Sequence, residues 1–294
     1  MKEKTMLAGA HTAIVTPFDS TGAIDYKIFR DLIDFQINDG IDGIVPVGTT
    51  GESPTLNPKE HMKVISETVR IVNGRALVIA GTGANSTAEA VELTKEAKEI
   101  GVDATLQVTP YYNKPNQEGL YRHFSTVADL GLPVVLYNVP GRTSREIAIE
   151  TVARLAKHEH VVAVKEAGGD VARVKQTLDA CEIQVLSGDD GLAVPMMRDG
   201  AAGLISVASN VVPGVIATMV HTAQEGLWTA AQLLHDEYID LFDGLFIDTN
   251  PIPVKAALAM MGKAEEVYRL PLCEMSAADK ETLRAILLRH DLLT

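Results

Sequence analysis

Short runs of apolar residues recur along the first 210 residues of the chain, and most of them are continuous rather than alternating with polar positions. Continuous runs rich in Val, Ile and Leu are typical of parallel β-strands that are buried on both faces. We therefore predict eight strands, over residues 10–15, 43–47, 76–80, 104–108, 134–137, 161–164, 183–186 and 203–207.

Amphipathic stretches separate these runs and carry the signals of helices. In the first stretch, Ile28, Leu32 and Phe35 recur at helical spacing, and Gly40 follows as a stop signal. In another, the segment Ser-Thr-Ala-Glu at 86–89 resembles a capping box. The eight predicted helices span residues 25–38, 57–73, 86–100, 117–130, 145–156, 170–180, 189–198 and 213–224.

Eight strands that are each followed by a helix indicate an α/β fold, the (β/α)8 or TIM barrel. The rival is a doubly wound open sheet, but Gly81-Thr82-Gly83 lacks the third glycine of a nucleotide-binding fingerprint. Beyond residue 224 the strand pattern stops, and residues 225–246, 253–261 and 276–293 have helical periodicity. We therefore predict a catalytic barrel domain over residues 1–224 and a C-terminal domain of three helices over residues 225–294.

Composition narrows the class of protein. The chain has 26 basic and 39 acidic residues, a formal net charge of −13, so we expect no binding to nucleic acid. No run reaches the ~18 apolar residues of a membrane helix, and the N-terminus lacks the apolar stretch of a signal peptide. Two cysteines, Cys181 and Cys273, cannot form a disulfide framework. We expect a cytoplasmic protein that does not bind membranes, and we favour an enzyme.

Lys165 is the most informative candidate for chemistry. It follows directly after the apolar run 161–164, and barrel active sites lie at the carboxyl ends of the strands. Burial favours the neutral amine, which can attack a ketone to form a Schiff base. The alternative is a structural lysine that pairs with Glu166 or extends to solvent.

Hydroxyl groups at neighbouring strand ends could serve this amine. Tyr137 ends the preceding strand and could transfer protons at the lysine-bound carbon. The hydroxyls of Thr50 and Tyr112 could complete a proton relay to solvent.

Two segments are suited to carboxylate binding. The turn Gly48-Thr49-Thr50-Gly51 can present successive N–H groups and hydroxyls, although an ordinary strand-to-helix loop is the alternative. Arg142 follows a Pro-Gly turn and is a candidate for bidentate carboxylate recognition in this acidic chain. A solvated surface arginine is the alternative at that position.

Other polar clusters receive no catalytic role. The segment His158-Glu159-His160 has no third ligand at a useful spacing, so no metal site is predicted. Asp189 and Asp190 could form an acid–base pair, but N-capping is the favoured role at the start of a predicted helix.

Four segments carry a resemblance to a known family. They are Gly-Thr-Thr-Gly-Glu-Ser at 48–53, Val-Thr-Pro-Tyr-Tyr-Asn-Lys-Pro at 108–115, Tyr-Asn-Val-Pro-Gly-Arg-Thr at 137–143 and Val-Lys-Glu-Ala at 164–167. In this order and spacing the chain resembles the 4-hydroxy-tetrahydrodipicolinate synthases, also called dihydrodipicolinate synthases, within the N-acetylneuraminate lyase family of class I aldolases. The resemblance extends over nearly the whole chain, from Thr12 to Lys255.

The resemblance implies an activity and an assembly. The expected enzyme is a lyase that condenses pyruvate, held as a lysine Schiff base, with L-aspartate 4-semialdehyde in diaminopimelate and lysine biosynthesis. It needs no metal or organic cofactor, and the family is usually a homotetramer, a dimer of dimers.

The resemblance also implies roles for single residues. Lys165 matches the Schiff-base lysine, and Tyr137 matches the tyrosine that relays protons with Thr50 and Tyr112. In the family this second tyrosine reaches into the active site of the neighbouring subunit. The residues matched to substrate binding are Thr49 and Thr50 for the pyruvate carboxylate, Arg142 for the semialdehyde carboxylate, and Gly188 and Ile205 near the bound pyruvate.

A regulatory site is implied as well, because some members are inhibited by lysine bound at a subunit interface. The matching positions are Ser53, Pro54, His61, Asn85, Glu89 and Tyr111. His61 and Glu89 are residue types of inhibitable members, whereas Pro58 departs from the histidine of some inhibited enzymes. Solvated helix residues are the alternative for His61 and Glu89.

Two other functions stay open from the sequence. One is another pyruvate aldolase of the same family, such as a sialic acid or 2-keto-3-deoxy sugar acid lyase, although Arg142 favours a substrate with a carboxylate. The other is a non-catalytic sensor of a pyruvate-like ligand. The complete set of Lys165, Tyr137, Thr50 and Tyr112 argues against that sensor.

Overall fold

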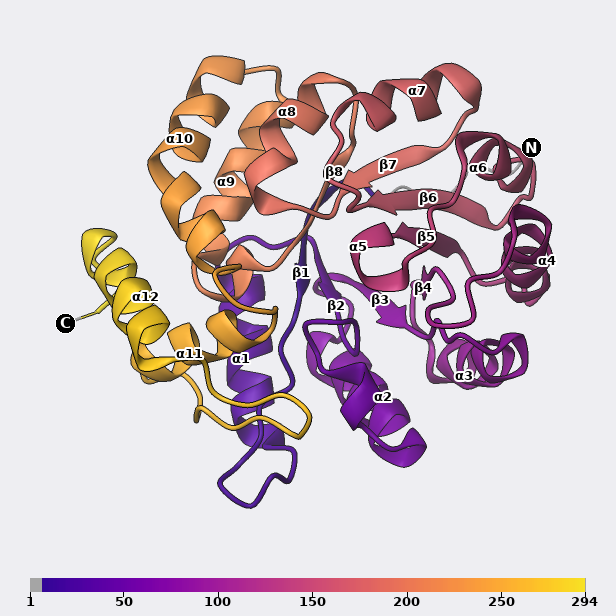
Figure 1. The fold of residues 1–294 in the computed structure, drawn as a ribbon. Coiled ribbons are helices and arrows are strands. Elements are labelled where there is room, and N and C mark those ends of the chain that lie inside the picture. The colour runs from indigo at the N-terminus through magenta and orange to yellow at the C-terminus, as the bar shows by residue number, and fades with distance from the viewer. Residues whose placement is uncertain (1–6, 294) are drawn as a thin grey trace.

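The computed structural model describes residues 7–293. The N-terminal segment for which no signal peptide is expected begins with residues 1–6, which lie outside the described residues, as does Thr294. Eight parallel strands close into a barrel in chain order, and β8 pairs back onto β1 (Figure 1). The strands are β1 Gly9–Ala13, β2 Gly43–Val45, β3 Leu77–Gly81, β4 Ala104–Val108, β5 Val134–Asn138, β6 Val161–Glu166, β7 Gln184–Ser187 and β8 Gly203–Ser206. Each strand overlaps a predicted apolar run, so the predicted TIM barrel is confirmed.

The strand side chains pack on both faces of the barrel wall. Val45, Leu106, Val135, Leu186 and Ile205 belong to a buried cluster inside the barrel. A larger cluster joins the outer face of the strands to the surrounding helices. Burial on both faces explains why the strand sequences are continuously apolar.

Helices surround this barrel (Figure 1). They are α1 Tyr26–Asn38, α2 Pro58–Val72, α3 Thr87–Ile100, α4 Gln117–Ala128, α5 Pro140–Thr143, α6 Ile149–Leu155, α7 Ala172–Ala180, α8 Ala193–Arg198 and α9 Pro213–Gln224. Short 3-10 turns lie at η1 Ser53–Thr55, η2 Asp190–Leu192 and η3 Ala208–Asn210.

Two local predictions are wrong. The helix predicted from residue 145 begins only at Ile149, because the N–H groups of Ile147 and Ala148 donate to the side chains of Asn138 and Gln117 instead. The capping box predicted at the start of α3 is also absent, since the Ser86 side chain makes no capping hydrogen bond.

The capping box lies at the start of α2 instead. There the Asn57 side chain accepts the N–H of Glu60 at 3.0 Å, and the Glu60 carboxylate accepts the N–H of Asn57 at 3.0 Å. Pro58 occupies the first helical position, where its missing N–H costs nothing.

Three helices follow the barrel, α10 Trp228–Gly244, α11 Ile252–Met260 and α12 Ala277–Arg289, so the predicted C-terminal extension is confirmed. Helix α10 packs against α9, and α12 packs against both α10 and α11 on one side of the barrel (Figure 1). The division into two domains at residue 224 stays a prediction. Among the described residues, no helix is both long enough and apolar enough to cross a membrane.

Candidate active site

Lys165 and Tyr137 lie side by side at the carboxyl ends of two neighbouring strands. They are Cα partners in the pairing of β5 with β6, and the Lys165 Nζ lies 4.5 Å from the centroid of the Tyr137 ring. The lysine is only 5% exposed, and within residues 7–293 its amine makes no ion pair. The structure therefore shows a buried amine beside an aromatic ring, with no carboxylate bound to it.

Gly188 leaves the space that this lysine occupies. A Cβ atom at Gly188 would lie 2.8 Å from the Lys165 Cε and 2.7 Å from the Cβ of Ala167. Both distances are shorter than van der Waals contact, so a side chain at this position would displace the lysine. Gly188 is thus placed at the site as expected, and its contribution is the absence of a side chain.

A cavity of about 120 Å³ opens onto Lys165 and Tyr137. Its wall includes four of the predicted binding residues, which are Thr49, Thr50, Arg142 and Gly188. It also includes residues to which the sequence gave no binding role, among them Asp189, Val207, Phe246 and Asn250. We call this space the inner cavity.

Asn250 connects two of the predicted binding residues. Its Nδ2 donates to the Thr50 Oγ1 at 3.0 Å, and its carbonyl oxygen accepts from the Arg142 Nη2 at 3.0 Å. Because the Thr50 oxygen already accepts this bond, its O–H is free to donate to an acceptor such as a carboxylate. Sequence separation concealed this contact, since Asn250 follows Thr50 by 200 residues.

Asp189 caps the start of η2 and also lines the wall of the inner cavity. Its Oδ1 accepts the N–H of Gly191 at 3.0 Å, so the predicted capping role is confirmed. Burial raises the pKa of Asp189, while the charge of Lys165 acts in the opposite direction. The sequence missed the second position because capping already accounted for the residue.

Two predicted residues lie off the wall of the inner cavity. Tyr112 is 91% exposed, with φ of 71°, and it does not line the cavity. Ile205 is fully buried in the cluster inside the barrel, and Val207 lines the cavity in its place. In the part of the chain that the structure describes, the hydroxyls of Tyr137, Thr50 and Tyr112 are not hydrogen-bonded to one another.

A second, outer cavity of about 440 Å³ adjoins the first and shares Thr49, Tyr137 and Arg142 with its wall. Most of the predicted regulatory residues line it, namely Ser53, Pro54, His61, Glu89 and Tyr111. Asn85 lies beside this wall, where its Nδ2 donates to the carbonyl oxygen of Tyr111 at 3.3 Å. The structure therefore brings the six predicted positions together.

The ring of His61 lines this outer cavity. Its Nε2–H donates to the carbonyl oxygen of Gly81 at 2.8 Å. Burial lowers the pKa of His61, and the hydrogen bond to Gly81 and the charges of Glu89 and Glu96 oppose that effect. An imidazole held in this way keeps Nδ1 as a hydrogen-bond acceptor.

The histidine pair considered for metal binding has ordinary partners. His158 Nε2 lies 3.1 Å from Asp129, and His160 Nε2 lies 3.2 Å from Glu159. Over residues 7–293 no group of three or more His, Cys, Asp or Glu side chains is arranged to hold a metal ion.

The chain matches the family model described as the dihydrodipicolinate synthetase family over residues 6–290. It is 52% identical to the 4-hydroxy-tetrahydrodipicolinate synthase of Thermodesulfovibrio yellowstonii, over 96% of this chain and 98% of the relative. A crystal structure of the Acinetobacter baumannii dihydrodipicolinate synthase in complex with pyruvate is 44% identical and superposes with a TM-score of 0.96, covering 98% of this chain and 100% of that one. The Cyanidioschyzon merolae enzyme with lysine bound is 40% identical, with a TM-score of 0.94 over 97% of this chain and 99% of that one.

Proposed function

The chain belongs to the dihydrodipicolinate synthetase family, and we propose that its inner cavity condenses pyruvate with L-aspartate 4-semialdehyde. The chain is a lyase of the class I aldolase type, a 4-hydroxy-tetrahydrodipicolinate synthase of diaminopimelate and lysine biosynthesis. The observation that carries the proposal is the buried amine of Lys165, which lacks an ion-pair partner within residues 7–293 and faces a cavity beside Tyr137.

The reaction begins at Lys165. Its neutral amine attacks C2 of pyruvate, water leaves, and an iminium forms that withdraws electrons from the adjacent methyl group. Loss of a methyl proton gives an enamine, whose carbon attacks the aldehyde carbon of the semialdehyde and forms the new C–C bond. The substrate amine then attacks C2 and displaces Lys165, which closes the ring of the product.

Proton transfer falls to three hydroxyl groups. Tyr137 lies next to Lys165 and can deliver a proton to the alkoxide formed at the aldehyde carbon. Thr50 and Tyr112 extend this path towards solvent. The 91% exposure of Tyr112 in a single chain supports an assembly in which this residue enters a neighbouring subunit's site, and we propose the homotetramer of the family.

The two carboxylates of the substrates have separate partners. Thr49 and Thr50 bind the pyruvate carboxylate, next to Gly188, and Arg142 binds the semialdehyde carboxylate at the border of the two cavities. Arg142 places positive charge locally in a chain of net charge −13, which favours anionic substrates. We place this reaction in the cytoplasm.

The outer cavity is the proposed site of feedback inhibition by lysine. The carboxylate of Glu89 could bind an ammonium group of the inhibitor lysine, and the Nδ1 of His61 could accept a hydrogen bond from it. A lysine titration of the initial rate tests this site. Inhibition that is lost in Glu89→Gln supports it, and an unchanged rate at millimolar lysine contradicts it.

One experiment tests the activity itself. Purified protein is incubated with pyruvate and borohydride, which reduces the iminium to a stable amine, and the modified residue is identified by mass spectrometry. Turnover is then compared for aspartate semialdehyde and for cleavage of sialic acid. Labelling at Lys165 with turnover of the semialdehyde supports the proposal, whereas sialic acid cleavage indicates the other lyase and labelling without turnover indicates a sensor.

A further inference from the structure

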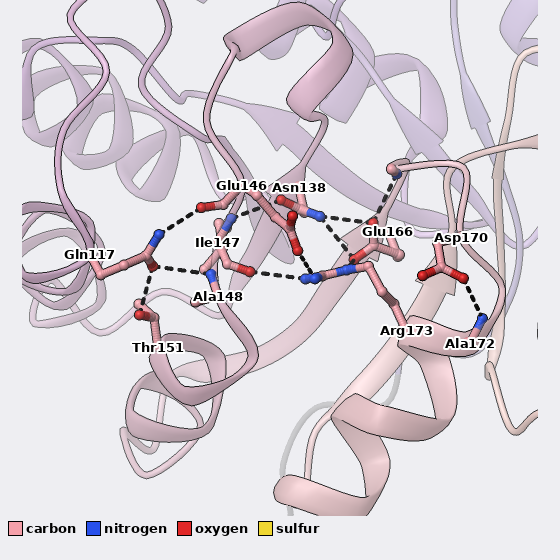
Figure 2. Close-up of polar contacts among 11 residues, drawn as sticks. Gln117, Asn138, Glu146, Ile147, Ala148, Thr151, Glu166, Asp170, Ala172 and Arg173 are labelled. Carbon is pink, nitrogen blue, oxygen red and sulfur yellow. Dashed lines mark hydrogen bonds and ion pairs between the residues drawn. The ribbon is translucent and has the colours of Figure 1, made fainter.

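A closed ring of polar contacts joins side chains and backbone groups next to β6 (Figure 2). Successive side chains of a strand point to opposite faces, so Glu166 faces away from the cavity that Lys165 lines. The ring consists of Asn138, Glu166, Arg173 and Ile147, and we call it the polar ring.

Glu166 accepts four hydrogen bonds. Asn138 Nδ2 donates to Oε1 at 2.8 Å and to Oε2 at 3.0 Å. Arg173 Nε donates to Oε2 at 3.0 Å, and the Gly168 N–H donates to Oε1 at 2.8 Å. Glu166 therefore pairs with Arg173 of α7 and not with Lys165, its neighbour in the sequence.

Ile147 closes the ring through its backbone (Figure 2). Its N–H donates to the Asn138 Oδ1 at 3.0 Å, and its carbonyl oxygen accepts from the Arg173 Nη2 at 2.9 Å. Ile147 lies in the segment between α5, which carries Arg142, and α6. The polar ring thus links three elements that each carry a site residue or lead directly to one.

The ring fixes the alignment of the two catalytic strands where it matters. Asn138 and Glu166 are Cα partners one residue beyond Tyr137 and Lys165. The pairing of β5 with β6 shifts register between Val134 and Val135 and is then continuous from Val135 to Asn138. The bonds between Asn138 and Glu166 add a side-chain link to the backbone pairing at that end.

Burying the Glu166 carboxylate in the polar ring carries a large desolvation cost. Glu166 is only 2% exposed, and burial raises its pKa to about 7 against the hydrogen bonds from Asn138 and Gly168. Buried ion pairs often contribute no more stability than apolar packing would. The fit is also tight, because a Cβ at Gly168 would lie 2.8 Å from the Glu166 Oε1.

We propose that Glu166 is a positioning residue, which through the polar ring holds Lys165 and Tyr137 in the alignment needed for Schiff-base chemistry. The proposal rests on the proposed function of the inner cavity. Glu166 does not contact the Lys165 amine or the Tyr137 hydroxyl. It acts through its hydrogen bonds to Asn138 and Arg173.

The variant Glu166→Gln tests this role. Each carboxylate oxygen accepts from two donors, so an amide nitrogen in either place faces two donors and breaks the ring. We expect kcat per folded molecule to fall by about tenfold or more, because small misplacements of reacting groups are costly, with a smaller change in KM for pyruvate. The rate of borohydride trapping at Lys165 in a single turnover should fall in parallel.

Two further variants make the result specific. Gly168→Ala keeps every side chain of the polar ring, but its added methyl group would press on the Glu166 carboxylate. The trapping rate should therefore fall by a few-fold, which tests the role even if Glu166→Gln folds poorly. Asp42→Asn is the control, since Asp42 directly precedes β2 at the opposite end of the barrel, where its Oδ2 accepts the N–H of Ala10 at 2.7 Å. It should lose stability while trapping pyruvate at close to the wild-type rate.

The outcomes separate the two proposals. Wild-type trapping rates in both ring variants would overturn the positioning role alone, as would an equal fall in Asp42→Asn. Wild-type protein that gains no mass at Lys165 would overturn the proposed function and the positioning role with it.

Discussion

Two lysines are buried among residues 7–293, and they differ in what surrounds the amine. Lys255 of α11 is 2% exposed and forms an ion pair with the buried Glu52 carboxylate. Its Nζ also lies 4.2 Å from the Phe18 ring centroid, so protein groups surround the charge. Lys165 is equally inaccessible, but in the described part of the chain no carboxylate pairs with it, and it borders a cavity.

The difference teaches how burial alone should be read. A buried amine with a carboxylate partner is a structural element, because the pair satisfies the charge. A buried amine that borders a cavity and forms no ion pair is available to react with a ligand. The four predictions below test this contrast.

The largest effect is expected for Lys165→Ala. Without the amine no iminium can form, so turnover should fall by about three orders of magnitude or more, while the protein stays folded. Initial rates and circular dichroism measure the two properties. The comparison fails if this variant keeps normal activity, or if Lys255 rather than Lys165 carries the borohydride label.

Lys255→Met should affect stability instead of chemistry. It leaves Glu52 buried without its partner, which costs about 3–5 kcal/mol of unfolding free energy. The double variant Glu52→Gln with Lys255→Met should recover most of that loss, because it removes both charges. Urea unfolding measures both, and a single variant as stable as wild type would show that the pair is not structural.

His123 of α4 extends the comparison to a buried base that neither forms an ion pair nor borders the inner cavity. Its Nδ1 lies 2.9 Å from the Thr87 Oγ1, and burial lowers its pKa to about 4. Below its ordinary pKa near 6.5 the unfolded chain binds a proton that the folded protein does not. The free energy of unfolding should therefore decrease as the pH falls from 6.5 towards 4, by about 2 kcal/mol at pH 5.

Urea unfolding at pH 7.5 and pH 5 measures this loss. The variant His123→Gln lacks the titrating group and is the control, so wild type should lose about 2 kcal/mol more than the variant between the two conditions. Equal losses in the two proteins would show that His123 is not held neutral.

The smallest effect is expected for Tyr112→Phe. Removing the hydroxyl from the proposed relay should slow turnover by about tenfold to a hundredfold, the lower range of general acid–base catalysis. Tyr112 is 91% exposed in the single chain. The melting temperature of the monomeric variant should therefore equal that of the monomeric wild type. Wild-type rates in this variant would remove Tyr112 from the relay.

The fold and the candidate lysine were predictable because their signals are local in the sequence. Eight apolar runs define the strands, and Lys165 follows one of them directly. The partners that give other residues their meaning come from far along the chain. Lys255 and Glu52 are 203 residues apart, and the helix predicted from residue 145 gives way to bonds with Asn138 and Gln117.

The resemblance to a family supplied what local patterns did not. It implied Gly188 and the outer-cavity positions and named a substrate for Arg142, and the structure gathers these residues around two adjoining cavities. It did not reveal Asn250, whose link between Thr50 and Arg142 is visible only in three dimensions.

The bare backbone at Gly188 sets how this chain tolerates mutation. A single added methyl group would contest the volume filled by the methylenes of Lys165, yet it would remove no hydrogen bond of the barrel. In a library that scores cellular abundance and growth separately, alanine at codon 188 should leave the first near normal and abolish the second. Loss of function without loss of protein would then require the smallest substitution available.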